Sequence, residues 1–396
     1  MISDDSVLKL RKSMSVKSII KSYIRKVLYH FPIQKSKIVF LNYDGKGYGD
    51  NPKYIAEEIV RQKLPWKMVW LVRNGYDVPS YIKKVDIDGF AAFYALSTAK
   101  VIVSNCKNNI PFHYITRKKE KQYYLQSWHG DFGPKYIEKE IENVLSPNYL
   151  NATKADSAAT DAVLSGNVFF SGVLRESFWL PKRCEVLEYG VPRNDIYFRG
   201  KEVKNKLKRQ YGFSLDDRIL LYAPTFRDDL DVSCYNIDFE RLRKALSQMS
   251  NETWKIVVRL HPNISSKADL FCYNENIIDG TDYSDQQELC MICDCLITDY
   301  SSIMADFMLM KKPVFLYVTD LEKYSDKKTG RGLRDLYFAL PFSLSRNQEE
   351  LERHVLQFNK ETYAEELGAY MQKYYCTFDN GHASESVVNH LKNVLS

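Results

Sequence analysis

Five stretches of the sequence end a short apolar run with side chains suited to acid–base or phosphate chemistry. These are "SWHG" (127–130), "PRND" (192–195), "PTFR" (224–227), "RLHP" (259–262) and "DYSS" (299–302). An imidazole can take up a proton near neutral pH, and guanidinium groups bind phosphate oxygens. One such residue would be weak grounds for a site, because a lone histidine usually has a structural role. Five such apolar runs that end in similar side chains together predict a functional site.

The elements that must position these side chains are strands of an α/β fold. Short runs rich in Val, Ile and Leu alternate with helical patterns, and we expect strands at 37–41, 67–72, 100–104, 123–126, 167–172, 185–189, 218–223, 255–260, 295–298 and 313–318. Such runs are typical of parallel strands that are buried on both faces. Ligands of open α/β sheets bind beyond the carboxyl ends of the strands. The sequence therefore brings His129, Arg193, Thr225, His261 and the two serines to that edge.

Local signals add a helix start and a phosphate-binding turn. In "NPKYIAEEIVRQ", Asn51 is expected to cap a helix whose first turn holds Pro52. Ser301 and Ser302 precede the helical pattern "IMADFMLM", where free amides and hydroxyls favour a phosphate, although capping alone would explain one serine. Arg193, Arg227 and Arg259 add positive charge, or Arg259 points into the sheet instead.

The domain organisation follows from the charged stretch 198–212, which separates two series of strands. We expect two Rossmann-like domains that face a cleft, at 38–200 and 201–375. A basic amphipathic segment at 1–37 precedes them and a C-terminal helix at 376–396 follows them.

The basic residues of the chain are concentrated at its N-terminus. Residues 1–37 hold nine Lys and Arg against two Asp, whereas the whole chain carries +6, so the excess lies entirely there. Lys17, Lys21 and Arg25 recur every four residues beside an apolar stripe that includes Ile20 and Ile24. This pattern favours a helix on an anionic membrane surface over one packed on the protein itself. Nucleic acid is not expected as a partner, because the rest of the chain is not basic.

Several site classes lack support in the sequence. No apolar run reaches about 18 residues and no signal peptide is recognisable, so a cytosolic chain with reduced cysteines is expected. Cys290, Cys293 and Cys295 lack an evident fourth ligand, which favours buried thiols over structural zinc. The glycine-rich stretch 44–52 fits neither nucleotide-binding fingerprint, and no carboxylate cluster calls for magnesium.

The motifs together resemble those of the CDP-glycerol glycerophosphotransferases, the teichoic acid primase- and polymerase-like enzymes. The resemblance covers residues 38–390 and rests on "QSWHG", "YGVPRNDIYF", "LLYAPTFRDD", "RLHPN", "LITDYSSIMADFMLMKKPVFLY", "GRGLRD" and "FDNGHASESV". It implies a glycosyltransferase-B (GT-B) fold with an acceptor-side first domain and a nucleotide-donor second domain. It also implies transfer of glycerol phosphate from CDP-glycerol to a hydroxyl of a lipid-linked acceptor, with release of CMP, at the cytoplasmic face of the membrane. No cofactor or metal is implied.

The resemblance also assigns roles to residues. His129 is implied as the general base and His261 as its partner at the transferring phosphate. The implied donor- and phosphate-binding residues are Arg193, Asn194, Thr225, Arg227, Asp299, Ser301, Ser302 and Arg331; Gly130, Asp131 and Ser384 are implied as further cleft residues. Attack on the β-phosphorus needs a base for the acceptor hydroxyl, and an imidazole titrates in the right range.

Departures from the family pattern leave alternatives open. Asp131 stands where related enzymes often carry Thr, and Asn380-Gly381 stands where they usually read Asp-Gly. A single-transfer primase, a polymerase or a capsule enzyme therefore all remain possible, as does CDP-ribitol as donor. A GT-B glycosyltransferase that uses a nucleotide sugar, or a membrane-bound scaffold without activity, are the alternatives of other classes. The oligomeric state is left open.

Overall fold

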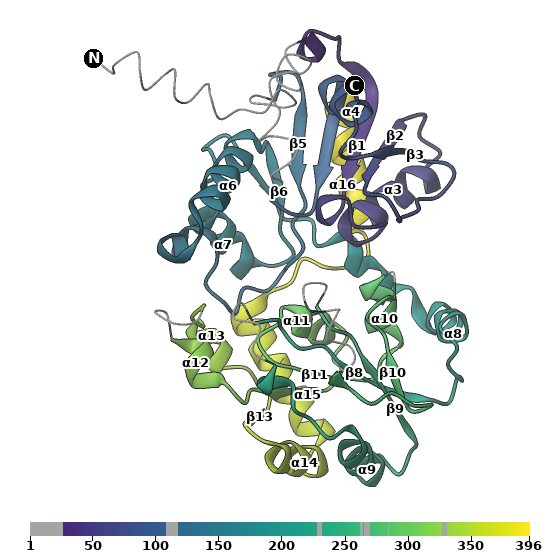
Figure 1. The fold of residues 1–396 in the computed structure, drawn as a ribbon, viewed down its shortest axis with the longest axis vertical. Helices are drawn as coiled ribbons and strands as arrows, with labels where there is room; N and C mark the ends of the chain where they lie inside the picture. Colours follow the sequence, from purple (N-terminus) through teal and green to yellow (C-terminus); the bar gives the residue numbers. More distant parts are fainter. Residues whose placement is uncertain are drawn as a thin grey trace.

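The computed structural model describes residues 27–107, 118–227, 232–261, 264, 270–283, 285–326 and 331–396. Within these residues the chain forms two β-sheets of parallel strands, each covered by helices. Figure 1 shows the two sheets in separate lobes, one above the other along the long axis of the molecule. Both sheets follow the strand order of a doubly wound Rossmann fold. The GT-B-like architecture expected from the sequence is confirmed.

The first sheet has the order β3-β2-β1-β4-β5-β6-β7, and all its described neighbours pair in parallel. Its strands are β1 (Gln34–Leu41), β2 (Lys67–Val72), β3 (Lys83–Asp86), β4 (Ala99–Ser104), β5 (Tyr123–Gln126), β6 (Ala162–Leu164) and β7 (Glu185–Leu187). The helices of this half are α3 (Asp50–Arg61), α4 (Phe90–Thr98), α6 (Pro147–Ala159) and α7 (Val168–Ser177), with the 3-10 helix η2 (Glu138–Val144).

The second sheet repeats this arrangement with the order β10-β9-β8-β11-β12-β13. Its strands are β8 (Arg218–Tyr222), β9 (Trp254–Val258), β10 (Ile277–Asp279), β11 (Cys295–Thr298), β12 (Val314–Tyr317) and β13 (Leu344–Ser345). Its helices are α8 (Gly200–Gln210), α9 (Phe239–Ser250), α10 (Gln286–Ile292), α11 (Ile303–Leu309), α12 (Leu321–Ser325), α13 (Asp335–Phe338), α14 (Gln348–Leu356) and α15 (Lys360–Tyr370). In each sheet the strand order reverses next to the first strand of the domain, and this is where such folds bind ligands.

The chain crosses between the two halves twice. It leaves the first sheet through the 3-10 helix η3 (Pro192–Phe198), and it returns after η6 (Met371–Tyr375) to end in α16 (Ala383–Leu395). Val387, Val388 and Leu391 of α16 are fully buried in the core around β1 and α3. The C-terminal helix, yellow in Figure 1, therefore completes the core of the first domain.

All the expected strands but one are present, with small shifts at their ends. The exception is 167–172, where the prediction is wrong, because α7 begins at Val168. The side chain of Asn167 accepts a hydrogen bond from the Phe170 amide and caps the helix. Phe170, Val173 and Leu174 then form one buried face at helical spacing. A short apolar run cannot distinguish a strand from a buried helix.

The cap expected at Asn51 is also absent, because α3 begins two residues earlier than expected, at Asp50 with Gly49 as its N-cap residue. The side-chain Nδ2 of Asn51 instead donates to the carbonyl oxygens of Ser127 at 3.0 Å and Trp128 at 2.9 Å. Its side-chain oxygen accepts the Arg193 amide at 3.1 Å. Asn51 thus joins two segments that the sequence brought to the site separately.

The N-terminal stripe of Lys17, Lys21 and Arg25 lies outside the described residues. Among the helices that the structure does describe, none has both the length and the apolar character needed to cross a membrane.

We expect Gly190→Ala to lower the free energy of unfolding more than Gly200→Ala does. Gly190 has φ +86°, and an added Cβ would lie 2.9 Å from the Asp379 carboxylate and 3.2 Å from its Cα. Gly200 has φ +77°, but an added Cβ there meets no atom within 4 Å. Gly200→Ala should therefore lower the free energy of unfolding by only about 1–2 kcal/mol, because alanine is disfavoured in the left-handed conformation. Gly190→Ala should cost a further 1–3 kcal/mol or so for overpacking.

Urea unfolding of the two variants and the parent measures this difference. Equal losses of unfolding free energy for the two variants would show that the crossing segments relax around the added methyl group.

Candidate active site

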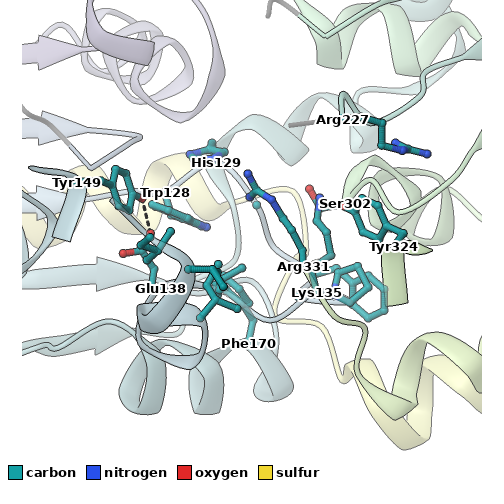
Figure 2. Close-up of a pocket in the computed structure, with 18 of the residues that line it drawn as sticks. Trp128, His129, Lys135, Glu138, Tyr149, Phe170, Arg227, Ser302, Tyr324 and Arg331 are labelled. Atoms are coloured by element: carbon teal, nitrogen blue, oxygen red, sulfur yellow. Dashed lines mark hydrogen bonds between the residues drawn. The ribbon is translucent and has the colours of Figure 1, made fainter. Parts of the chain in front are cut away.

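A cavity of about 830 Å³ lies between the carboxyl edges of the two sheets. The first domain contributes Trp128, His129, Gly130, Lys135, Glu138, Tyr149 and Phe170 to its lining, and the second contributes Arg227, Ser302, Asp320, Lys323, Tyr324 and Arg331. Figure 2 shows His129 facing Arg331 and Ser302 across this space. Three of the five predicted run ends, 127–130 of the first domain and 224–227 and 299–302 of the second, therefore meet in one place.

His129 follows β5 and is held by its Nδ1 atom. Nδ1 lies 2.7 Å from the carbonyl oxygen of Asn105, which follows β4. Since a carbonyl only accepts hydrogen bonds, Nδ1 carries the proton and Nε2 is the basic atom of the neutral ring. Burial lowers the pKa of His129 from 6.5, although the Asn105 carbonyl and Asp50 oppose this shift. At neutral pH the ring is therefore neutral and can accept a proton.

A buried ion pair supports the loop that carries His129. Arg193 donates to the Asp50 carboxylate at 2.8 Å and to the backbone carbonyl of His129 at 2.6 Å. Tyr43 donates to the same carboxylate at 3.0 Å, and its ring contacts the imidazole at a centroid distance of 5.4 Å. Arg193 is 3% exposed, so it lies behind His129 and does not line the cavity.

His261 follows β9 in the second domain and is not part of the cavity lining, although Lys135 and Arg331, which line the cavity, lie near it. Its ring packs against Phe226 at a centroid distance of 4.6 Å, and Arg331 lies over the same Phe226 ring at 5.8 Å. Burial lowers the pKa of His261 to about 4, and the positive charges of Lys135 and Arg331 add to this effect. His261 is therefore also neutral at neutral pH.

Arg227 and Asp299 form a second buried ion pair, which supports the loops of the second domain that line the cavity. Asp299 accepts the Thr225 amide at 2.9 Å and the Arg227 guanidinium at 2.9 Å. Arg227 also donates to Asp320 at 2.7 Å. Because its guanidinium is paired with the carboxylates of Asp299 and Asp320, Arg227 adds little net positive charge to the cavity.

The structure brings only part of the predicted site to the cavity surface. His129, Gly130, Arg227, Ser302 and Arg331 line it. Ser301 accepts the Ile303 amide at 3.4 Å, and Ser302 is the N-cap residue of α11 without a side-chain cap hydrogen bond. Behind the lining lie Arg193, Asn194, Thr225 and Asp299, all buried.

Asp131 and Ser384 do not lie at the cavity. Asp131 accepts the Gly166 amide at 2.9 Å and the Tyr375 hydroxyl at 2.6 Å beneath the crossing segment, and it is 3% exposed. Ser384 lies in the first turn of α16, where its amide donates to Asp195. Both stabilise the chain crossing, because they pack where the C-terminal segment returns to the first domain.

The other expected groups have structural roles in the described residues. Arg259 donates to the carbonyl oxygens of Gly280 and Tyr283, so it points along the sheet edge and not into the cavity. Cys290, Cys293 and Cys295 are buried in the cores of the second domain. Within the described ranges, no group of three or more His, Cys, Asp or Glu side chains is arranged to hold a metal ion.

Sequence reasoning missed several lining residues, above all Lys135, Glu138, Tyr149, Lys323 and Tyr324. Most of them lie in loops and short helices that show no apolar periodicity. Lys135 had one detectable signal, since it follows the histidine motif by six residues in the same loop. Residues 134–136 pair with 332–334 across the cleft through the Arg334 amide and the Pro134 carbonyl at 2.9 Å.

Comparison with known proteins finds one family over nearly the whole chain. The family described as CDP-Glycerol:Poly(glycerophosphate) glycerophosphotransferase matches residues 23–393. The teichoic acid poly(glycerol phosphate) polymerase of Staphylococcus epidermidis is 30% identical over 382 residues, which is 90% of this chain and 50% of that protein. The chain thus spans half the length of that relative. The teichoic acid glycerol-phosphate transferase of Staphylococcus aureus is 31% identical over 385 residues, covering 91% of this chain and 94% of that protein.

A solved structure has the same architecture. The wall teichoic acid polymerase TagF superposes with a TM-score of 0.81 at 28% identity, covering 100% of this chain and 98% of that chain. A variant of TagF has also been solved after a soak with CDPG.

Replacement of Arg331 by Gln should raise the pKa of His261. The guanidinium disfavours a protonated imidazole beside it, so its removal favours the charged form and moves the pKa up from about 4. Histidine-labelled NMR titration of the variant and the parent measures the shift. Arg175→Gln is the control, because Arg175 pairs with Glu188 on the surface. An unchanged His261 pKa in Arg331→Gln would contradict the proximity of these two groups.

Proposed function

Because the chain belongs to the CDP-glycerol:poly(glycerophosphate) glycerophosphotransferase family, we propose that it transfers glycerol phosphate from CDP-glycerol to a hydroxyl group of a membrane-linked acceptor. CMP is the second product. The observation that carries this proposal is the neutral His129, whose Nδ1 is fixed on Asn105 and whose Nε2 remains as a base in a cavity with basic walls. The relatives named above act, by their names, on glycerol phosphate in teichoic acid synthesis.

The reaction in this cavity begins with the acceptor hydroxyl, which gives its proton to Nε2 of His129. The hydroxyl oxygen attacks the β-phosphorus of CDP-glycerol and forms the new P–O bond. The bond between that phosphorus and the bridging oxygen breaks, and CMP leaves with the electron pair on its phosphate. A phosphate is a good leaving group, so catalysis depends on orientation and on stabilising the phosphoryl oxygens.

The diphosphate is placed against Arg331, Lys135 and Ser302, all of which line the cavity. His261, which is neutral because of its low pKa, is proposed to offer its one remaining N–H group near the same phosphates. Arg193 and Arg227, which the sequence assigned to the phosphates, are reassigned to support, since each is held by buried carboxylates. With these cations, no metal ion is required in the proposal, and retained activity in EDTA tests that part.

The acceptor is proposed to be the membrane-linked end of a teichoic acid or a similar surface polymer, made at the cytoplasmic face of the membrane. The test is incubation with a lipid-linked acceptor and CDP-glycerol, CDP-ribitol or nucleotide sugars in parallel. CMP release and a phosphodiester product with CDP-glycerol support the proposal. Preferential turnover of CDP-ribitol would reassign the donor, and a glycosidic product would reassign the reaction. No turnover of any donor would favour a scaffold.

His129→Ala should lower turnover of CDP-glycerol by about a hundredfold or more, because general-base catalysis typically contributes that much. The fold should be retained, and circular dichroism checks it. His382→Ala is the matched control, since the His382 side chain is 70% exposed and pairs with Glu385 on the surface. Near-normal turnover of His129→Ala would remove it as the base.

The pH profile of the parent enzyme gives an independent check on the same residue. The active form is the neutral imidazole, so kcat/KM should stay high at neutral pH and fall only below 6.5, where His129 becomes protonated. The His129→Ala variant should lack this acid limb.

Membrane attachment is proposed to use the N-terminal stripe, which lies outside the described residues. Each basic side chain near an anionic surface contributes about 1 kcal/mol. Replacing Lys17, Lys21 and Arg25 by Glu should therefore release the protein from anionic vesicles, as should added salt. Sedimentation with vesicles measures this, and activity on a soluble acceptor should survive. Unaltered binding of the triple variant would show that the stripe packs on the protein.

A further inference from the structure

Among the residues that the structure describes, two carboxylates line the cavity, those of Glu138 and Asp320. Asp320 is paired with Arg227, whereas Glu138 is buried and lies near His129. Oε1 accepts a hydrogen bond from the Tyr149 hydroxyl at 2.5 Å, and Oε2 accepts one from Thr153 at 2.5 Å. Glu138 is 5% exposed, and both of its donors come from α6. A carboxylate oxygen has about two acceptor positions, so each oxygen retains capacity for another donor.

The backbone at Glu138 supports a role for this side chain. Glu138 has φ +52°, a left-handed conformation that glycine or asparagine adopts more readily than glutamate. Such conformations persist at sites where the surrounding structure holds them in place. Here two hydroxyl groups hold the carboxylate at the cavity wall.

The charges of the cavity are unevenly distributed around His129. Figure 2 shows Glu138 and Tyr149 on one side of His129, and Arg331, Ser302 and Arg227 on the other. Glu138 is close enough to His129 to favour its protonated form. A phosphate would be repelled by this carboxylate and attracted to Arg331, since Arg227 is neutralised by Asp299 and Asp320, whereas hydroxyl groups can donate to Glu138. The Glu138 side is therefore the place for an uncharged, hydroxyl-bearing group.

We propose that Glu138 binds a hydroxyl group of the acceptor next to the one that attacks, and so selects acceptors that end in a vicinal diol. This inference rests on the proposed function, and it adds the chemical class of the acceptor end. The carboxylate accepts the neighbouring hydroxyl and turns the attacking one toward Nε2 of His129. Chains that end in a phosphate are disfavoured, because their charge would lie against Glu138.

The experiment compares two soluble acceptors that differ in one hydroxyl group. One is an alkyl glycerol phosphate that ends in a vicinal diol, and the other is the alkyl 3-hydroxypropyl phosphate, which lacks the secondary hydroxyl. The parent, Glu138→Ala, Glu138→Gln and Glu142→Gln are each assayed for CMP release. The affinity of each ester is also measured by calorimetry without donor. Glu142 is the matched control, since it lies in the same 3-10 helix η2, pairs with Lys154 and does not line the cavity.

The parent should prefer the diol by tenfold to a hundredfold, about the effect of one hydrogen bond to a charged group. In Glu138→Ala this preference should fall close to one, with the KM for CDP-glycerol within twofold of the parent. Glu138→Gln keeps the side-chain volume and should give an intermediate preference if the alanine variant folds poorly. Glu142→Gln should behave as the parent.

Two results would overturn the inference. One is a parent that binds and uses both esters equally. The other is a diol preference that persists in both Glu138 variants while only their melting temperature falls, which is the mark of a purely structural carboxylate. Failure of the proposed function is visible separately. If the parent releases no CMP from CDP-glycerol but binds the diol in a Glu138-dependent way, the proposed donor is wrong and the diol site at Glu138 still stands.

Discussion

The buried ion pair between Arg193 and Asp50 joins the three parts of the chain on which the site depends. Asp50 opens α3, Arg193 lies in the first crossing between the domains, and the guanidinium also holds the backbone carbonyl of His129. Removal of either partner would leave a buried charge without its counter-charge, which typically costs about 3–5 kcal/mol. The next residues extend the connection, since Asn194 donates to Asp379 and Asp195 accepts the first amides of α16. The "PRND" segment is therefore a structural junction that positions His129.

The second domain uses the same device under the opposite wall. Asp299 holds the Thr225 amide and the Arg227 guanidinium, and Asp320 shares that guanidinium. In both domains a buried carboxylate and an arginine fix the loop that follows a strand. Lys135 and Arg331 also line the cavity, and they are the cations that the proposed function assigns to the donor phosphates.

Contacts on two sides of the cleft hold the domains at their observed separation. On one side Lys53 of α3 contacts Asp285 at 2.6 Å and Glu288 at 2.8 Å. On the other side Arg334 contacts Glu140 of η2, next to the paired segments 134–136 and 332–334. Because η2 also carries Glu138, the position of the cavity wall depends on contacts with the second domain.

The sequence by itself determined the fold class and the residues at the strand ends, because both depend on local information. Buried parallel strands need continuous apolar runs, and the carboxyl ends of such strands share an edge within each sheet. His129 could therefore be placed at the edge of the first sheet and Ser302 at the edge of the second from sequence order alone. Only the tertiary structure decided which polar groups face the cavity. Arg193 and Asp131 look like ligand-binding residues in the sequence, but their partners, Asp50 and Tyr375, are distant along the chain. A side chain's direction depends on which of its partners lies closest in space, and spacing along one chain does not contain that information.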